Sequence, residues 1–240
     1  MSSGTWTAIA VANARICSIQ GWRAVEAQHV IATAELTDSL AEQSLLETIL
    51  EANKPAKPAG TEYLHWLLFT PFRYRPVAPG SRFRAMNAPG VFYAADVIRT
   101  ACAELGYWRW RFLMDCDSLQ QLEPRAHTVF SSQAHGRMVD LREAPFNRHQ
   151  AQWTDPYRYS ATQALAEDAR LAHIDIIRYQ SVRDPQAGGC SAVLSASSFD
   201  PKHPIEQQTW QLYVTAQRVV WQREYLNQQY AFEFTTAAWQ

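Results

Sequence analysis

The chain has 240 residues and a formal net charge of −1, from 22 basic and 23 acidic side chains that are interleaved along the sequence. It therefore lacks the strongly positive surface that duplex nucleic acid or an anionic membrane attracts, which argues against direct binding of either. Hydrophobic residues make up 47% and charged residues 19% of the chain, as in a globular protein with one large domain or two small ones.

The cysteines and histidines lack the spacing of a metal site. The four cysteines, at positions 17, 102, 116 and 190, form no C-x-x-C pair, and the seven histidines form no H-E-x-x-H motif. Reduced thiols in a cytosol explain these cysteines more simply than disulfides. No stretch approaches 18 apolar residues, and no cleavable apolar leader is recognisable. We therefore expect a cytoplasmic protein that binds no metal.

The first part of the chain is predicted to be helical. Residues 5–53 carry a loose amphipathic pattern that is sharpest over 39–52, where Ser39 and Glu42 form a capping box. Prolines at positions 55 and 58 end this helix. Residues 1–60 are too few to hold a core alone, so a helical extension packed on a domain over 61–240 is favoured over a partner-binding appendage.

The middle of the chain combines short apolar runs with helical patterns. The elements predicted there, in chain order, are strands over 64–72 and 90–94, a helix that Asp96 caps and that ends near Leu113, strands over 128–130 and 138–141 joined by a turn at His135 and Gly136, and a helix over 161–172.

The C-terminal third is rich in β-branched and aromatic residues, in short segments separated by Pro, Gly, Asp and Asn. The strands predicted there cover 174–179, 191–195, 210–215, 218–222 and 230–234. Because strands and helices mix without a βαβ rhythm, the pattern predicts an α+β fold instead of a doubly wound sheet.

Three arginines, Arg73, Arg75 and Arg82, lie within ten residues ahead of the predicted strand over 90–94. The planar guanidinium fork fits phosphate oxygens, so these side chains are candidates for holding a diphosphate. Arg75 and Arg84 are explained equally well as solvated loop charges. The sequence has no P-loop, nucleophile elbow or Gly-x-Gly-x-x-Gly motif, so a bound nucleotide must be held in another way.

Glu104, Tyr93 and Ser181 are further candidates that local pattern alone leaves open. A carboxylate among small apolar residues, such as Glu104, is more often exposed than buried, and if buried it needs a partner or a function. Tyr93 and Phe92 alternate in a strand, so one of them fills the core while the other faces away from it. Ser181 follows a predicted strand and reads as an ordinary serine at the start of a loop.

Several segments together resemble the RES-domain family, the toxins of RES-Xre type toxin-antitoxin systems, named for an arginine, a glutamate and a serine. The segments that carry the resemblance are Phe72-Arg73-Tyr74, Gly80-Ser81-Arg82-Phe83, Gly90-Val91-Phe92-Tyr93, Ala101-Cys102-Ala103-Glu104, Tyr159-Ser160-Ala161-Thr162-Gln163 and Arg178-Tyr179-Gln180-Ser181-Val182-Arg183. Arg82, Tyr93 and Glu104 are each eleven residues apart, a spacing associated with the core of this family. The resemblance covers roughly residues 64–200.

The resemblance implies an ADP-ribosyltransferase-like α+β fold, with mixed or antiparallel sheets and flanking helices, and NAD as the substrate. It implies catalytic roles for Arg73, Glu104 and Ser181, and NAD binding by Arg73, Tyr74, Arg82, Tyr93 and Ser181, without a metal. Family members cleave the bond between nicotinamide and ribose. They use either inorganic phosphate, which leaves ADP-ribose 1-phosphate, or a protein acceptor, as in a mono-ADP-ribosyltransferase.

The resemblance also implies a partner, an Xre-type antitoxin protein that restrains the toxin and supplies any DNA binding. The favoured function is an enzyme that degrades NAD, by phosphorolysis first and by hydrolysis as a glycohydrolase otherwise, and ADP-ribosylation of a protein target is the enzymatic alternative. An alternative of another class is a catalytically idle protein that only binds the antitoxin. The sequence does not decide whether the protein forms a homodimer.

Overall fold

The computed structural model describes residues 5–27, 36–74, 76 and 79–240. The helices in this part of the chain are α1 (Thr5–Asn13), α2 (Leu40–Ala52), α3 (Trp66–Arg73), α4 (Ile98–Met114), α5 (Gln150–Trp153) and α6 (Ser160–Leu171), with 3-10 turns η2 (Phe146–His149), η3 (Ala196–Ser198) and η4 (Thr236–Trp239). The strands are β1 (Arg15–Glu26), β2 (Phe92–Ala95), β3 (Gln121–Asp140), β4 (Ile176–Gln180), β5 (Gly189–Val193), β6 (Glu206–Thr215), β7 (Arg218–Tyr225) and β8 (Gln228–Thr235).

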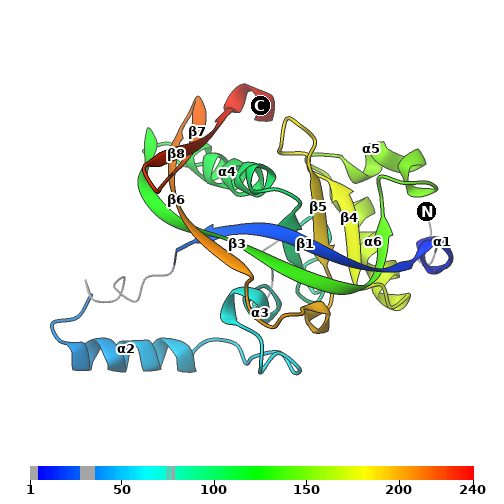
Figure 1. Ribbon diagram of the computed structural model, residues 1–240, viewed down its shortest axis with the longest axis horizontal. Helices are drawn as coiled ribbons and strands as arrows, with labels where there is room; N and C mark the ends of the chain where they lie inside the picture. Colours follow the sequence, from blue (N-terminus) through cyan, green and yellow to red (C-terminus); the bar gives the residue numbers. More distant parts are fainter. Residues whose placement is uncertain (1–4, 28–35, 75, 77–78) are drawn as a thin grey trace.

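Five of the strands close into a ring, in which each strand pairs with the next in the order β1, β2, β5, β4, β3 and back to β1. The pairing of β3 with β4 is parallel, and the other four pairings are antiparallel. Gly21 allows β1 to approach β2 closely, because a Cβ atom there would meet the Cβ of Ala94 at 2.7 Å. Beyond the ring, β3 continues into the antiparallel sheet β3-β6-β7-β8 (Figure 1).

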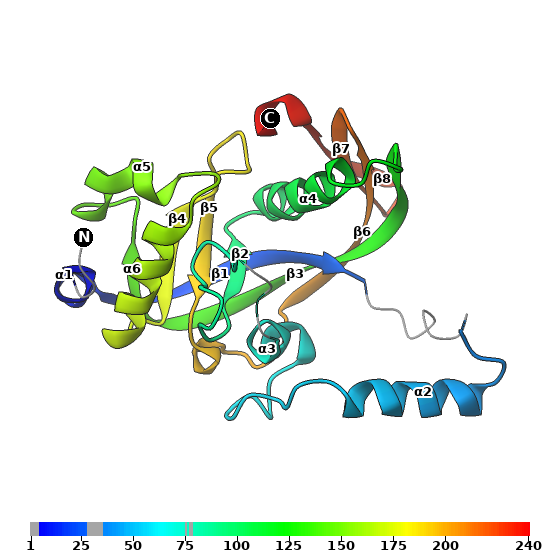
Figure 2. The same cartoon turned by 180° about the vertical axis from the view of Figure 1, so that it is seen from behind.

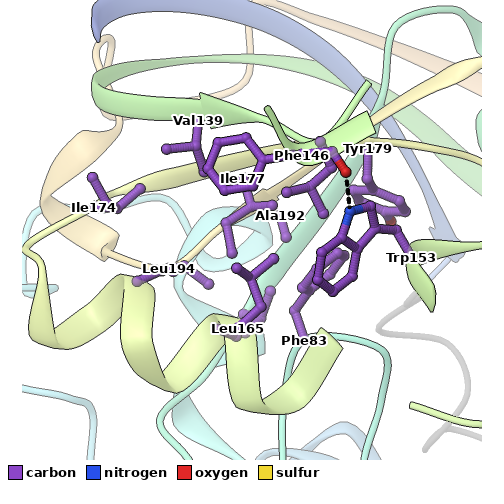
Figure 3. Packing of buried hydrophobic residues seen from close by; sticks show 14 of the residues in the cluster. Phe83, Val139, Phe146, Trp153, Leu165, Ile174, Ile177, Tyr179, Ala192 and Leu194 are labelled. Atoms are coloured by element: carbon purple, nitrogen blue, oxygen red, sulfur yellow. Dashed lines mark hydrogen bonds between the residues drawn. The ribbon is translucent and has the colours of Figure 1, made fainter. Parts of the chain in front are cut away.

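Helices cover this sheet on separate faces, as Figures 1 and 2 show. Helix α4 packs on β6, β7 and β8 through a buried cluster that includes Trp110, Trp221 and Trp239. Helix α6 packs on the ring through Leu165, in a cluster with Phe83 and Ile177 that Figure 3 shows from close by. Helix α3 buries Leu67, Leu68 and Phe69 against a third cluster, which β1, β2, β3 and β4 share.

Helix α2 lies away from the sheet (Figures 1 and 2), and it contacts the rest of the fold through the ion pair of Glu51 with Arg73 of α3. None of its residues is buried, and Leu40, Leu45 and Ile49 are exposed. Ser39 caps it as predicted, because its side chain accepts a hydrogen bond from the amide of Glu42. No helix in the described ranges is both long and apolar enough to cross a membrane.

The α+β fold that the sequence predicts is confirmed, and so are helices α4 and α6, strand β2 and the five C-terminal strands. The prediction of helix throughout 5–53 is wrong, because residues Arg15–Glu26 form strand β1. This strand is partly buried on both faces, so its apolar residues show neither a clear helical nor a clear strand period. The division of the chain into residues 1–60 and 61–240 stays a prediction. Residues 1–60 include strand β1, which belongs to the same sheet as the strands of 61–240.

Three further predictions are wrong. The apolar run over 64–72 is helix α3, which His65 caps by accepting a hydrogen bond from the amide of Leu67. The segments over 128–130 and 138–141 belong to one strand, β3, without a turn between them. Gly136 in this strand makes room for Asp175, whose Oδ2 would lie 2.6 Å from an added Cβ. Val97, not Asp96, is the residue before α4.

Candidate active site

A cavity of about 520 Å³ opens between β1, β2, α4 and the loop before β2, which is a typical size for a small-molecule site. Its charged lining residues in the described part of the chain are Arg23, Arg82, Arg84, Arg183 and Glu104. Aromatic side chains, including Trp108, line the same space. An excess of cations over carboxylates in an aromatic cavity suits an anionic ligand with planar rings.

Glu104 lies on α4, and its carboxylate is held by Ser181 at the end of β4. The Ser181 hydroxyl donates to Oε1 of Glu104 at 2.5 Å and accepts from the amides of Arg183 (3.2 Å) and Asp184 (3.0 Å). Ser181 is 1% exposed and lies behind Glu104, outside the cavity lining. Because its hydroxyl proton is already donated to Glu104, Ser181 acts here as a positioning residue for the carboxylate.

Burial raises the pKa of Glu104 above its ordinary value of 4.5. The hydrogen bond from Ser181 and the charges of Arg82 and Arg183 act in the opposite direction, without cancelling the effect of burial. The fold therefore holds a desolvated carboxylate at a fixed position in the cavity. Such a group is costly for stability, and perturbed carboxylates of this kind concentrate at functional sites.

The loop before β2 positions Arg82, and Tyr93 holds that loop. The Tyr93 hydroxyl accepts from the amide of Phe83 at 2.9 Å and shares a hydrogen bond of 2.8 Å with Ser81 Oγ. Gly80 enters the loop with a φ of +92°, a conformation that favours glycine. Arg82 donates to the carbonyl of Trp153 at 2.8 Å and is 8% exposed.

Tyr93→Phe is expected to lower the free energy of unfolding by about 1–3 kcal/mol, because the buried amide of Phe83 would lose its acceptor. Because phenylalanine keeps the aromatic ring, a loss of stability in this variant would come from the missing hydroxyl and not from poorer packing. Urea denaturation of wild type and variant measures the change. A variant as stable as wild type would show that the hydroxyl does not hold the loop.

Arg183 lies in the loop after β4, two residues beyond Ser181, and its guanidinium stacks on an aromatic ring of α4. Its guanidinium lies 3.6 Å from the ring centroid of Tyr107, and it donates to the hydroxyl of Tyr159 at 3.2 Å and to the carbonyl of Pro156. Its own carbonyl accepts from Nε1 of Trp239 at 2.7 Å. The ring of Tyr159 also lies 4.8 Å from the guanidinium of Arg82, so this tyrosine joins the two cations.

Arg82, Tyr93 and Glu104 line one cavity, with Ser181 behind them, but the structure does not bring Arg73 and Tyr74 there. Arg73 lies at the end of α3, where its Nε donates to the carbonyl of Pro55 at 2.5 Å and its NH1 pairs with Glu51 at 2.9 Å. Tyr74 is exposed and is absent from the cavity lining.

Arg75 lies outside the described residues. Arg84 lines the cavity, but its three nitrogens donate to backbone carbonyls, those of Ala88, Pro71 and Tyr74. The main role of Arg84 is therefore to stabilise the loop before β2.

Sequence reasoning gave no role to three residues of the cavity, Arg23, Tyr159 and Arg183. Tyr159 and Arg183 lie in segments that carried the family resemblance, so the resemblance could have identified them as residues of the cavity. Arg23 lay in the segment that was expected to be helical, and nothing in its local sequence pointed to the cavity. In the described part of the chain, no group of three or more His, Cys, Asp or Glu side chains is placed to hold a metal ion.

Residues 56–215 match the RES domain model. The chain belongs to the RES domain family. Arg82, Tyr93, Glu104, Ser181 and Arg183 all lie inside the matched RES domain, whereas Arg23 precedes it.

A solved structure shows the same fold. The RES chain matches a chain of the M. tuberculosis MbcT-MbcA toxin-antitoxin complex with a TM-score of 0.51 and 12% sequence identity, over 90% of this chain and 95% of that one. At this identity the similarity establishes the fold alone. No curated protein matches the RES chain.

Proposed function

We propose that this RES domain protein cleaves the bond between nicotinamide and ribose in NAD, and that inorganic phosphate accepts the ADP-ribosyl group. The observation that carries the proposal is the half-buried carboxylate of Glu104, fixed by Ser181 in a cavity whose other charged lining residues, in the described part of the chain, are arginines. The products are nicotinamide and ADP-ribose 1-phosphate. The family membership supports this choice of substrate, because the cavity alone fits many anionic nucleotides.

The charge that develops in this reaction explains why a carboxylate is needed. As the C–N bond breaks, its electron pair goes to the pyridinium nitrogen, and nicotinamide leaves as a neutral molecule without a general acid. The ribose carbon becomes oxocarbenium-like, and a fixed carboxylate stabilises this cation more than it stabilises the ground state. A phosphate oxygen then forms the new C–O bond, as in other glycosyl transfers.

The arginines supply the anion sites that the two substrates need. Arg82 and Arg183 hold their guanidinium groups against the aromatic rings of Tyr159 and Tyr107, which limits their movement. Each uses one terminal nitrogen on protein acceptors, Arg82 on Trp153 and Arg183 on Pro156 and Tyr159. The remaining donors bind phosphate oxygens of NAD or of the attacking phosphate.

The test is to incubate the purified protein with NAD in the presence and absence of phosphate and to identify the products by mass spectrometry. We expect nicotinamide under phosphate, together with ADP-ribose 1-phosphate. Free ADP-ribose in both conditions would indicate water as the acceptor, and ADP-ribose attached to protein would indicate a mono-ADP-ribosyltransferase. No nicotinamide release under any condition would reject the proposal.

We further propose that the protein is a toxin held inactive by a cognate antitoxin. NAD loss arrests growth, so such an enzyme needs restraint, and the structural match comes from a toxin-antitoxin complex. The family resemblance suggests an Xre-type antitoxin that covers the mouth of the cavity. Co-purification of the two proteins and a loss of nicotinamide release in the complex are the expected results. A complex that cleaves NAD at the full rate would reject this arrangement.

A further inference from the structure

The loop between β4 and β5, residues 181–188, is joined to α4 by a second hydrogen bond beside that of Ser181 and Glu104. One turn earlier in α4, the hydroxyl of Thr100 donates to Oδ2 of Asp184 at 2.7 Å. Thr100 and Glu104 are four residues apart, so they lie on one face of the helix. The two hydrogen bonds therefore fasten the same loop to the same face of α4.

The carboxylate of Asp184 accepts hydrogen bonds from both segments. Its side chain is 2% exposed, and Oδ1 accepts from Arg99 of α4 and from the amide of Gln186 in the loop, the latter at 3.1 Å. The guanidinium of Arg99 in turn lies 4.8 Å from the ring centroid of Phe234 on β8. Both carboxylate oxygens therefore have donors, and a cation balances the buried charge.

The backbone of the loop links Asp184 to Ser181. The amide of Asp184 donates to the hydroxyl of Ser181 at 3.0 Å. The amide of Ser181 donates to the carbonyl of Gly188 at 2.8 Å, which closes the loop on itself. Gly188 also allows the loop to approach α4, because an added Cβ there would overlap Oγ1 of Thr100. A contact that fixes Asp184 therefore fixes Ser181 as well.

The position of this contact indicates a role beyond stability. A buried ion pair contributes little to stability by itself, because the cost of desolvation offsets the attraction. Thr100 and Asp184 do not line the cavity, so neither is placed to touch a substrate there. Their contacts lead instead to the loop that carries Ser181 and to the helix that carries Glu104, and these two groups must stay in register for the carboxylate to be oriented.

We propose that Thr100 and Asp184 are positioning residues, which clamp the 181–188 loop to α4 and thereby hold the hydroxyl of Ser181 on the carboxylate of Glu104. The inference rests on the proposed function for the reaction that this carboxylate serves, whereas the clamp itself requires no substrate. Orientation of this kind matters for rate, because a displacement of about 1 Å at a catalytic group costs up to about 100-fold.

Thr100→Val tests the clamp kinetically, because valine keeps the branched shape and removes only the hydroxyl. The value of kcat for nicotinamide release is expected to fall about 10-fold. The KM for NAD is expected to stay unchanged, since the side chain does not line the cavity. Thr100→Ser keeps the hydroxyl and is expected to restore the wild-type kcat. Should Thr100→Val fail to fold, Thr100→Ala takes its place with the same expected results.

A carbon-13 NMR titration of the Glu104 carboxyl tests the clamp without the reaction, with Glu104→Gln to assign the signal. The hydrogen bond from Ser181 lowers the pKa of Glu104, so a loosened loop should raise that pKa in Thr100→Val but not in Thr100→Ser. The titratable and charged groups that act on Glu104 are unchanged in both variants, and they are Arg82 before β2, Arg183 and Asp184 in the 181–188 loop, Tyr179 on β4 and Cys190 on β5.

Thr61→Val is the matched control for the loss of a buried threonine hydroxyl. Thr61 is 1% exposed, its hydroxyl donates to the carbonyl of Pro58 at 2.6 Å, and it does not line the cavity. Both valine variants are expected to melt below wild type, because each loses the hydrogen bond of a buried hydroxyl. Only Thr100→Val is expected to change kcat and the pKa of Glu104.

An unchanged pKa of Glu104 in Thr100→Val would overturn the proposal. If wild type cleaves NAD, a wild-type kcat in Thr100→Val, or an equal loss of kcat in Thr61→Val, would overturn it too. A raised pKa of Glu104 in a protein that releases no nicotinamide would uphold the clamp and reject the proposed function. Nicotinamide release that is the same in wild type and Thr100→Val would uphold the proposed function and reject the clamp.

Discussion

Glu104→Gln is expected to lower the rate of nicotinamide release from NAD by at least about 100-fold, the usual cost of removing one preorganised charge from a transition-state site. The glutamine keeps the size of the side chain and can accept the hydrogen bond from Ser181, so the cavity keeps its shape. What is lost is the negative charge beside the developing oxocarbenium ion. The loss should therefore fall on kcat more than on KM for NAD.

Glu123→Gln is the matched control, because Glu123 is exposed on β3 and removes one carboxylate without touching the cavity. Expression of each variant in growing cells gives a second measurement. Wild type and Glu123→Gln are expected to arrest growth without the antitoxin, whereas Glu104→Gln is not. A Glu104→Gln variant that releases nicotinamide at the wild-type rate would remove Glu104 from the mechanism.

The same substitution should not destabilise the fold at neutral pH. Burial raises the pKa of Glu104, so the folded state binds its proton more tightly than the unfolded chain does. The resulting stabilisation is complete below the ordinary value of 4.5 and is lost as the pH rises through the raised pKa. Above the raised pKa the ionised side chain is a cost, which glutamine avoids. Stability and activity should therefore change in opposite directions in this variant.

Ser181→Ala is expected to lower kcat/KM about 10- to 100-fold, because the carboxylate of Glu104 loses the group that orients it. The acid limb of the pH profile should also move to higher pH. The hydrogen bond from Ser181 lowers the pKa of Glu104, so its removal raises that pKa further. The free energy of unfolding should fall by about 2–4 kcal/mol, since two amides lose their acceptor.

Ser131→Ala separates these effects from the loss of a buried hydroxyl as such. Ser131 is fully buried on β3, and its Oγ has no hydrogen-bond partner in the described part of the chain. Its replacement should leave the unfolding free energy, kcat/KM and the pH profile nearly unchanged. If Ser181→Ala lowered kcat/KM without moving the acid limb, Ser181 would act in some way other than through Glu104.

Local sequence pattern predicted the elements whose burial is one-sided. Helix α6 has such a period, and the C-terminal strand β6 alternates between buried and exposed residues along its length. Strands β1 and β3 were misassigned because each has contacts on both faces or a close approach to a neighbouring segment. Strand β1 pairs with β3 and β2 at once, and β3 continues through Gly136, which looks like a turn residue in isolation but here makes room for Asp175.

The sequence predicted those residues of the candidate site that recur at a regular spacing in the family's motifs. Arg82, Tyr93 and Glu104 lie along one continuous loop, strand and helix, so their spacing in sequence already reflects their proximity. Ser181 came only from the family resemblance, because its partner is 77 residues away in the chain. Arg73 shares the arginine-rich motif but faces Glu51, which no sequence spacing could indicate.

The most direct test of the account is a crystal structure of Glu104→Gln soaked with NAD, because this variant should bind the substrate without cleaving it. The account predicts that the nicotinamide ribose lies beside residue 104 and that the diphosphate contacts Arg82 or Arg183. NAD bound elsewhere on the surface, or in the cavity with its ribose directed away from residue 104, would contradict it.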